Sequence, residues 1–342
     1  MTDPILRRAN ESDIAGIVRC LEAAFPHNPK ADEEVLRWQY WASPYGPPVS
    51  MVWDLDGEIL GHYTNIRYGA LLDGKPGTIG LGVDAALDPR LQGRGLFGPM
   101  ARGLYEASGH ESMPVTVCYP NRLSVKVIQR VGWKELGLLR THLLVLDSAW
   151  LADRVHAPKF AVTVARAALW HRQLTFGVDA HEESGPSAEL DNLWAHYGEH
   201  IRYGVRRDAA WFRWRYLERP QSAYRYYAAH TQGRLTGFAV TSQVMQSGVP
   251  FTYVLELITI DGKSARALAR VISRESEASA ALVVAALPGT RMSRDALAAG
   301  FRIVPARYEE KMLHFGVVDN VGGCPEIFEA PWELGWGDLD HL

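Results

Sequence analysis

The sequence predicts an α/β (α+β) fold made of two successive copies of one unit, and three observations support this. The chain has 342 residues, more than one ordinary core needs, and its composition of 47% hydrophobic and 22% charged residues is typical of globular proteins. Short apolar runs alternate with segments of helical periodicity in both halves. Motifs of the first half also recur in the second half at a constant spacing.

The first half contains strand and helix signals in a regular order. Asn10 to Asp13, for example, supplies an N-cap and a following acid before a helical apolar pattern, and Ser43-Pro44 ends the next helix. Periodicity and flanking turn residues predict a strand over 5–9, helices over 14–21 and 31–40, a hairpin of strands over 51–54 and 59–66 about Asp56-Gly57, a strand over 80–87, a helix over 96–107, a strand over 115–119, a helix over 122–131 and a strand over 136–146.

The loop Gln92-Gly93-Arg94-Gly95 carries the strongest chemical signal in the chain. It joins the strand over 80–87 to the helix over 96–107. Glycines at alternate positions let the backbone approach a bound anion closely, and the N-terminus of the following helix directs N–H groups to the same point. Arg94 adds a cation. The spacing alone leaves two interpretations open, an anion site and a plain turn between strand and helix.

The residues around this loop resemble the acyl-CoA motif of the GNAT acyltransferases. Gln92-x-x-Gly95 follows Leu87-Asp88-Pro89, although Phe97 stands where the motif has glycine or alanine. Pro120-Asn121-x-x-Ser124 and Gly132-Trp133 resemble a second landmark of the same family. The resemblance implies two tandem GNAT-like domains, each a mixed, mostly antiparallel sheet flanked by helices. It also implies that acetyl-CoA or another acyl-CoA lies as co-substrate in a gap between two diverging strands, with its pyrophosphate on the loop.

The resemblance further assigns expected roles to individual residues. The residues expected to bind the co-substrate are Ala85, Leu87, Gln92, Gly93, Arg94, Gly95, Leu96, Phe97, Asn121 and Ser124. Many family members carry a tyrosine general acid where this chain has Ile128. Tyr119 is our candidate for that role; the alternatives are another tyrosine, or a reaction that needs no such acid. Asp84, the one acid on its strand, is our candidate general base, or else it pairs with a cation. His62 and His200 have no supporting motif.

An internal repeat divides the chain. Arg37-Trp38-x-Tyr40-x-x-x-Pro44 recurs as Arg213-Trp214-x-Tyr216-x-x-x-Pro220 at an offset of 176 residues, and Gly132-Trp133 recurs as Gly300-Phe301 at an offset of 168. The second copy should therefore be eight residues shorter between Gly237 and Pro288. The glycine loop belongs in that interval, and the residues 260–264 there lack it.

The repeat predicts a catalytic first copy and a degenerate second copy. We expect an N-terminal GNAT domain over 1–147, a connector over 148–187 with a helix over 158–171 and a polar turn over 181–187, and a C-terminal GNAT-like domain over 188–342. Trp38 and Glu256 are our candidates for substrate contact. The alternative is that the Trp-x-Tyr pattern marks a packed helix in each half, and that Glu256 is a solvated edge residue.

Composition narrows the function classes. A net charge of −3 favours no general attraction to nucleic acid, and no apolar stretch predicts a membrane span. Three scattered cysteines lack metal spacing, so we expect no metal and a reducing, cytoplasmic setting. The favoured function is transfer of an acetyl or short acyl group to a primary amine of a small molecule, with amino sugars as one candidate class. One alternative is an acyl-CoA sensor. Another is an aminoacyl-tRNA-dependent transferase, and the intact glycine loop argues against this second alternative. The oligomeric state stays open.

Overall fold

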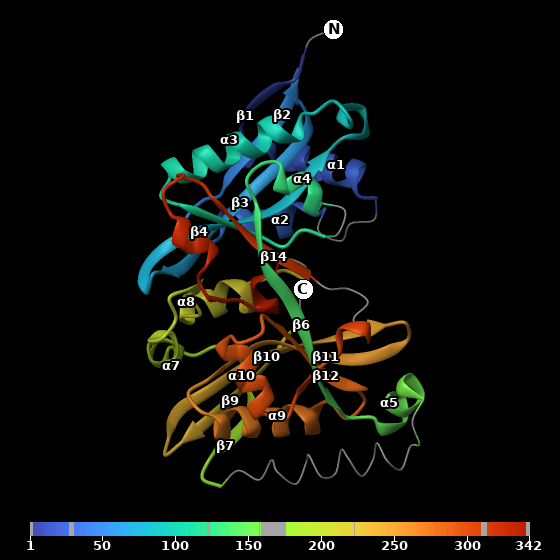
Figure 1. The fold of residues 1–342 in the computed structure, drawn as a ribbon, viewed down its shortest axis with the longest axis vertical. Coiled ribbons are helices and arrows are strands. Elements are labelled where there is room, and N and C mark those ends of the chain that lie inside the picture. Colours follow the sequence, from blue (N-terminus) through green and yellow to red (C-terminus); the bar gives the residue numbers. More distant parts are fainter. Residues whose placement is uncertain are drawn as a thin grey trace.

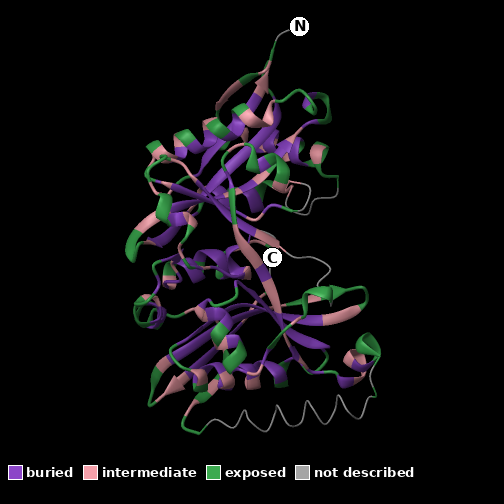
Figure 2. Cartoon of the chain, viewed as in Figure 1, coloured by how far each residue is buried: buried purple, intermediate pink, exposed green. Residues whose placement is uncertain are grey.

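A computed structural model describes residues 3–26, 31–121, 124–156, 158, 176–221, 223–308 and 313–339. Two lobes follow one another along the longest axis, each a sheet with helices packed on it (Figure 1). Figure 2 shows the strands largely buried and the outer faces of the helices exposed. The predicted class is confirmed: helices flank mixed, mostly antiparallel sheets.

The first lobe contains the predicted elements in the predicted order. They are β1 (Ile5–Arg8), α1 (Ile14–Ala24), α2 (Glu33–Trp41), β2 (Val49–Leu55), β3 (Glu58–Leu72), β4 (Lys75–Leu87), α3 (Phe97–His110), β5 (Val115–Cys118), α4 (Val125–Gln129) and β6 (Lys134–Val145). Strands β1 to β4 pair antiparallel in chain order, and β5 pairs parallel to β4. Helix α4 is shorter than predicted and is followed by a turn in which Gly132 has φ +99°.

The second lobe repeats much of this arrangement. Its elements are α5 (Ser148–Val155), β7 (Asp179–Glu183), α7 (Glu189–Gly198), β8 (Tyr203–Val205), α8 (Ala209–Phe212) with a π-helical turn (Arg213–Leu217), β9 (Arg225–Thr231), β10 (Arg234–Gln246), β11 (Val249–Thr259), α9 (Gly262–Glu275), β12 (Ala281–Ala286), α10 (Arg291–Ala298), β13 (Arg302–Ile303), β14 (Leu313–Asp319) and β15 (Trp332–Glu333). The helix predicted over 158–171 lies, except for its first residue, outside the described residues.

The offset of 176 residues found in the sequence also relates elements of the structure. Helix α2 corresponds residue for residue to 209–217, and β2 corresponds to β9. The turns that follow β2 and β9 both place a left-handed residue before a left-handed glycine, Asp56-Gly57 in one and Gln232-Gly233 in the other. The internal repeat is therefore a structural repeat.

The two copies exchange strands. Strand β14 from the second half lies in the first sheet between β5 and β6. The far end of β6 continues into the second sheet, where it pairs antiparallel with β12, as its course between the lobes in Figure 1 shows. Strand β7, inside the predicted connector, pairs with β9 at the outer edge of the second sheet. Each sheet therefore contains a strand from the other half. The domain boundaries predicted at residues 147 and 188 stay predictions.

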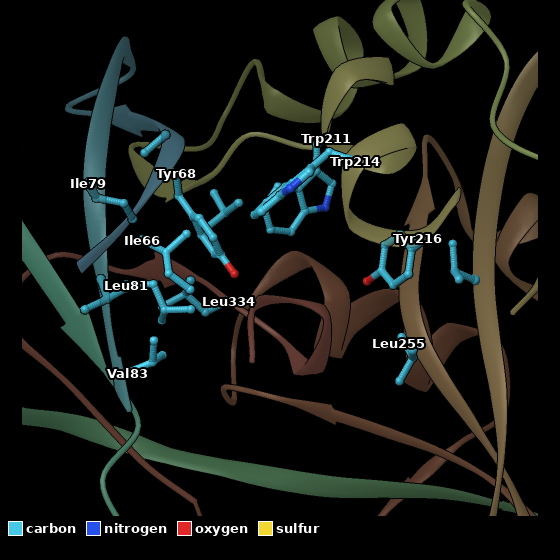
Figure 3. Close-up of a cluster of buried hydrophobic side chains, with 14 of the residues drawn as sticks. Ile66, Tyr68, Ile79, Leu81, Val83, Trp211, Trp214, Tyr216, Leu255 and Leu334 are labelled. Carbon is cyan, nitrogen blue, oxygen red and sulfur yellow. The ribbon is translucent and has the colours of Figure 1, made fainter. Parts of the chain in front are cut away.

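Two tryptophans at equivalent positions join the copies. The Trp38 indole N–H donates to the Trp214 carbonyl at 2.8 Å, and the Trp214 indole N–H donates to the Trp38 carbonyl at 3.2 Å. Their rings stack with centroids 5.5 Å apart. This reciprocity is the signature of a local twofold relation between the copies. The buried cluster around the pair contains Tyr68 of the first half and Trp211 of the second (Figure 3).

We expect Trp214→Ala to lower the free energy of unfolding by about 3–5 kcal/mol, because the indole is 2% exposed and has a bonded N–H. Urea unfolding measures this, with Leu217→Ala as control, since that side chain is 51% exposed. Combining Trp214→Ala with Trp38→Ala should cost less than the two single losses added together. Fully additive losses would contradict a reciprocal pair.

Candidate functional site

A gap opens in the first sheet where β4 and β5 diverge. The parallel pairing between these strands ends at Gly82 and Cys118. Beyond this point β4 remains paired only with β3, and a β-bulge interrupts that ladder between His62 and Thr64. Asp84 and Ala85 are the two bulged residues, and Asp84 has the left-handed φ of +54°. Bulges of this kind redirect side chains, and they are frequent beside active sites.

His62 holds the bulge in place. Its Nδ1 lies 3.1 Å from the Asp84 carbonyl oxygen, and its Nε2 lies 3.0 Å from the Ser50 hydroxyl. A carbonyl only accepts, so we assign the proton to Nδ1, and Nε2 accepts from Ser50. Burial lowers the pKa of His62 to about 4, which keeps the ring neutral at pH 7. Both nitrogens are occupied, so His62 positions the bulge.

The Asp84 carboxylate lies at the gap and is half-buried. The Tyr40 hydroxyl donates to Asp84 Oδ2 at 2.6 Å. The second copy has the equivalent pair, in which the Tyr216 hydroxyl donates to Glu256 Oε1 at 2.9 Å. The acid–tyrosine pair is therefore a property of the repeat. What distinguishes Asp84 is its exposure, because Glu256 is fully buried.

The glycine loop faces solvent beside this gap. Gly93 and Gly95 have φ of +75° and +74°, a region that favours glycine. A methyl group on either would meet no atom within 4 Å, so the space in front of the loop is open. The Gln92 side-chain amide donates to the Leu87 carbonyl at 3.0 Å and anchors the loop to the end of β4.

The amides at the start of α3 remain available for a ligand. The N-cap Leu96 offers no side-chain acceptor, and within the described chain the amides of Gly93, Arg94 and Gly95 donate to no other backbone group. Such groups, together with the helix dipole, attract anions. The Phe97 ring packs on Tyr63 with centroids 5.7 Å apart. The bulky residue therefore does not obstruct the loop.

In the second copy, the connection between the corresponding strand and helix is short and contains no glycine loop. Nine residues, 88–96, separate β4 from α3, but only 260 and 261 separate β11 from α9. The Asp261 carboxylate accepts from the amides of Lys263 and Ser264 at 2.9 and 2.8 Å, so the N-terminus of α9 has a partner from the chain itself. The expected loss of the loop from the second copy is confirmed.

The other predicted co-substrate residues, Asn121 and Ser124, bond to each other just before the neighbouring helix. Asn121 Oδ1 accepts from the backbone N–H and the hydroxyl of Ser124, both at 3.0 Å, at the start of α4. Asn121 is exposed. The contacts with a co-substrate that we predict for Asn121 and Ser124 stay predictions, and in this structure the pair orders the helix start.

The Tyr119 hydroxyl lies inside the protein. It is buried, has no hydrogen-bond partner within the described chain, and its ring packs on Phe315 of β14 at 5.5 Å. Burial raises the pKa of Tyr119 well above 10, and the nearby charge of Asp338 raises it further. The hydroxyl therefore has no direct route to solvent, which weighs against Tyr119 as the general acid.

Trp38 and Glu256, the two predicted substrate contacts, are enclosed between the copies. Trp38 is 8% exposed, and its N–H is bonded to Trp214. Glu256 Oε2 accepts from Arg207 Nε at 2.6 Å, an ion pair that sequence reasoning missed because Arg206-Arg207 has no spacing that specifies a partner. Their burial fits the alternative in which the aromatic pattern marks packed helices. The interpretation of Glu256 as a solvated edge residue is wrong.

Among the described residues, no group of three or more His, Cys, Asp or Glu is placed to hold a metal ion. No helix in those same parts of the chain is long and apolar enough to cross a membrane.

We expect acid to destabilise the chain through His62. The stability that neutral His62 contributes is complete above about pH 6.5 and is lost as the pH falls towards 4, because the unfolded chain takes up the proton first. The loss should reach about 3 kcal/mol. Urea unfolding between pH 7 and 4 should show a smaller loss for His62→Gln than for wild type. His200 is exposed, so His200→Gln should lose the same stability as wild type over this pH range. If the free energy of unfolding falls equally with pH in wild type and both variants, His62 does not have this role.

Comparison with known proteins agrees with this geometry. Residues 6–136 match the family model described as an acetyltransferase (GNAT) domain. None of the curated proteins searched matches the chain.

Three solved structures share the fold over most of the chain. A GCN5-related N-acetyltransferase from Anabaena variabilis ATCC 29413 is 10% identical, with a TM-score of 0.67 over 93% of this chain and 73% of that one. A probable N-acyltransferase from Enterococcus faecalis V583 is 11% identical, with a TM-score of 0.68 over 95% of this chain and 75% of that one. A GCN5-related N-acetyltransferase from Kribbella flavida is 15% identical, with 0.63 over 92% and 71%. Residues 6–136 thus match a GNAT acetyltransferase domain, and the chain as a whole shares its fold with these solved structures.

Proposed function

We propose that this chain is an acyl-CoA-dependent N-acyltransferase with one catalytic copy, the first. The observation that carries the proposal is the open glycine loop before the uncapped helix α3, beside the gap between β4 and β5. The GNAT domain match supports acyl transfer in general. The acceptor we propose is a primary amine of a small molecule, with amino sugars as one class to test.

The chain's own groups can be assigned to the co-substrate. We propose that the amides of Gly93 and Gly95 bind the pyrophosphate, with the exposed cation of Arg94 beside them. Acetyl-CoA or another acyl-CoA would supply the acyl group as a thioester. Ala85, the exposed residue of the bulge, is the backbone donor we propose for the developing oxyanion.

Asp84 is the residue we propose to take the proton of the attacking amine, directly or through a water molecule. Tyr40 acts as a positioning residue, because its hydroxyl fixes one carboxylate oxygen at 2.6 Å. A thiolate leaves readily near neutral pH, so the interior position of Tyr119 does not prevent turnover. The free thiols of Cys20, Cys118 and Cys324 are compatible with the reducing, cytoplasmic setting that we propose.

Gly95→Trp should abolish binding of acetyl-CoA, because the side chain would fill the space in front of the loop. Gly248→Trp is a matched control, since Gly248 has φ +79° and equally open surroundings but lies in the turn between β10 and β11. Both variants should lose a similar stability of about 1–2 kcal/mol. Calorimetric titration should show loss of binding for Gly95→Trp alone.

The same titration separates the alternatives. Unchanged affinity in Gly95→Trp would show that the loop assignment is wrong. Binding by wild type without thiol release on any amine of a panel would favour an acyl-CoA sensor over an enzyme.

Asp84→Asn should lower the acylation rate about 100-fold or more, since this is the usual contribution of a general base. The loss should be greatest at low pH, where less of the amine is neutral. Tyr40→Phe is the companion variant: it keeps the carboxylate, so it should shift the pH profile while retaining most of the rate. A pH–rate profile of Asp84→Asn identical to wild type would remove Asp84 as the base.

A further inference from the structure

The second copy also has a gap between diverging strands. The parallel pairing of β11 with β12 is confined to Thr252–Leu282 and Tyr253–Val283, although β11 continues to Thr259 and β12 to Ala286. By the repeat, β11, β12 and α10 correspond to β4, β5 and α4. These are the three elements that border the proposed co-substrate gap in the first copy.

The C-terminal segment of the chain (Trp332–Leu339) lies against all three elements. Gly335 forms an antiparallel bridge with Ala286 of β12, and the Trp336 ring stacks on Tyr253 of β11 with centroids 4.3 Å apart. The Glu333 carboxylate accepts from the backbone N–H of Arg291, the first residue of α10, at 2.6 Å. The segment thus occupies the gap of the second copy.

The fit is closest at two glycines. A Cβ on Gly337 would lie 1.9 Å from Glu256 Oε1 and 2.4 Å from the Tyr216 hydroxyl. A Cβ on Gly335 would lie 2.4 Å from the Met292 sulfur. The groove therefore admits glycine at both positions, with an aromatic residue between them.

Buried polar groups hold the end of the segment. Asp338 Oδ2 accepts from Arg207 Nη2 at 2.8 Å and from the Gly335 backbone N–H at 2.7 Å. Arg215 Nε donates to the Gly337 carbonyl at 3.1 Å. Arg207 is 5% and Arg215 2% exposed, so these bonds form away from water, where leaving either cation without a partner would be costly.

We infer that the second copy has become a peptide-binding groove and that the chain's own C-terminal segment is its ligand. The groove takes a peptide of the pattern Gly-aromatic-Gly-Asp, folded into a 3-10 turn over Trp336–Asp338, in the place that corresponds to the proposed acyl-CoA gap. The inference goes beyond the proposed function. It implies that the second gap is closed to acyl-CoA by a bound peptide as well as by the loss of the glycine loop.

Full-length Gly337→Val tests the groove, with Gly323→Val as matched control. Gly323 is near the same end of the chain, and a Cβ there would meet no atom within 4 Å. Hydrogen exchange of residues 252–259, 282–287 and 332–339 should be slow in wild type and in Gly323→Val. It should rise by about tenfold or more in Gly337→Val, because the segment no longer seats. Trp336→Ala, a milder change, provides the same readout if Gly337→Val does not fold.

A synthetic peptide of residues 331–342 completes the test. Added to Gly337→Val, it should slow exchange in β11 and β12 again, and calorimetry should show at most one acetyl-CoA bound to each wild-type chain. Exchange unaffected by Gly337→Val, no protection by the peptide, or two acetyl-CoA bound per chain would overturn the inference. A chain that binds no acetyl-CoA would refute the proposed function and leave the exchange experiment valid.

Discussion

The N–H groups in the first turn of an α-helix have no partners within the helix, and the two copies in this chain satisfy them in different ways. In the second copy, Asp261 caps α9 with its carboxylate. In the first copy, α3 follows Leu96, which offers no such acceptor, and two left-handed glycines keep the approach open. The assignment of the first copy as the anion-binding copy depends on this difference.

Two features are common to the copies and show what the repeat preserves for stability. The tryptophan pair relates equivalent helices by mutual hydrogen bonds, and each copy joins a tyrosine of that helix to an acid on its diverging strand. In the second copy this acid is sealed against Arg207, whereas in the first it remains half-exposed at the bulge. One arrangement of residues thus serves packing in one half and is available for chemistry in the other.

Much of the fold could be predicted from local patterns, but long-range pairing could not. Caps, glycines and periodicity located α1, α2, β2 and the start of β3 to within a few residues, whereas β3 continues to Leu72, beyond the predicted end at 66; the repeat located the missing loop. Strand β7 was missed because His181 to Glu183 reads as a polar turn. It is an edge strand, and Glu182 is paired with Arg225 of β9. The burial of Trp38 and Glu256 depends on contacts between the halves, which no local pattern shows.

The exchanged strand β14 has a consequence for how the protein matures. It lies beside β5, which borders the proposed catalytic gap, yet it is supplied by residues 313–319. The ribosome must therefore translate residues 119–319, after β5, before the first sheet can close. Until then the GNAT domain, although encoded first, exposes an unpaired edge, and its maturation is tied to the completion of its partner copy.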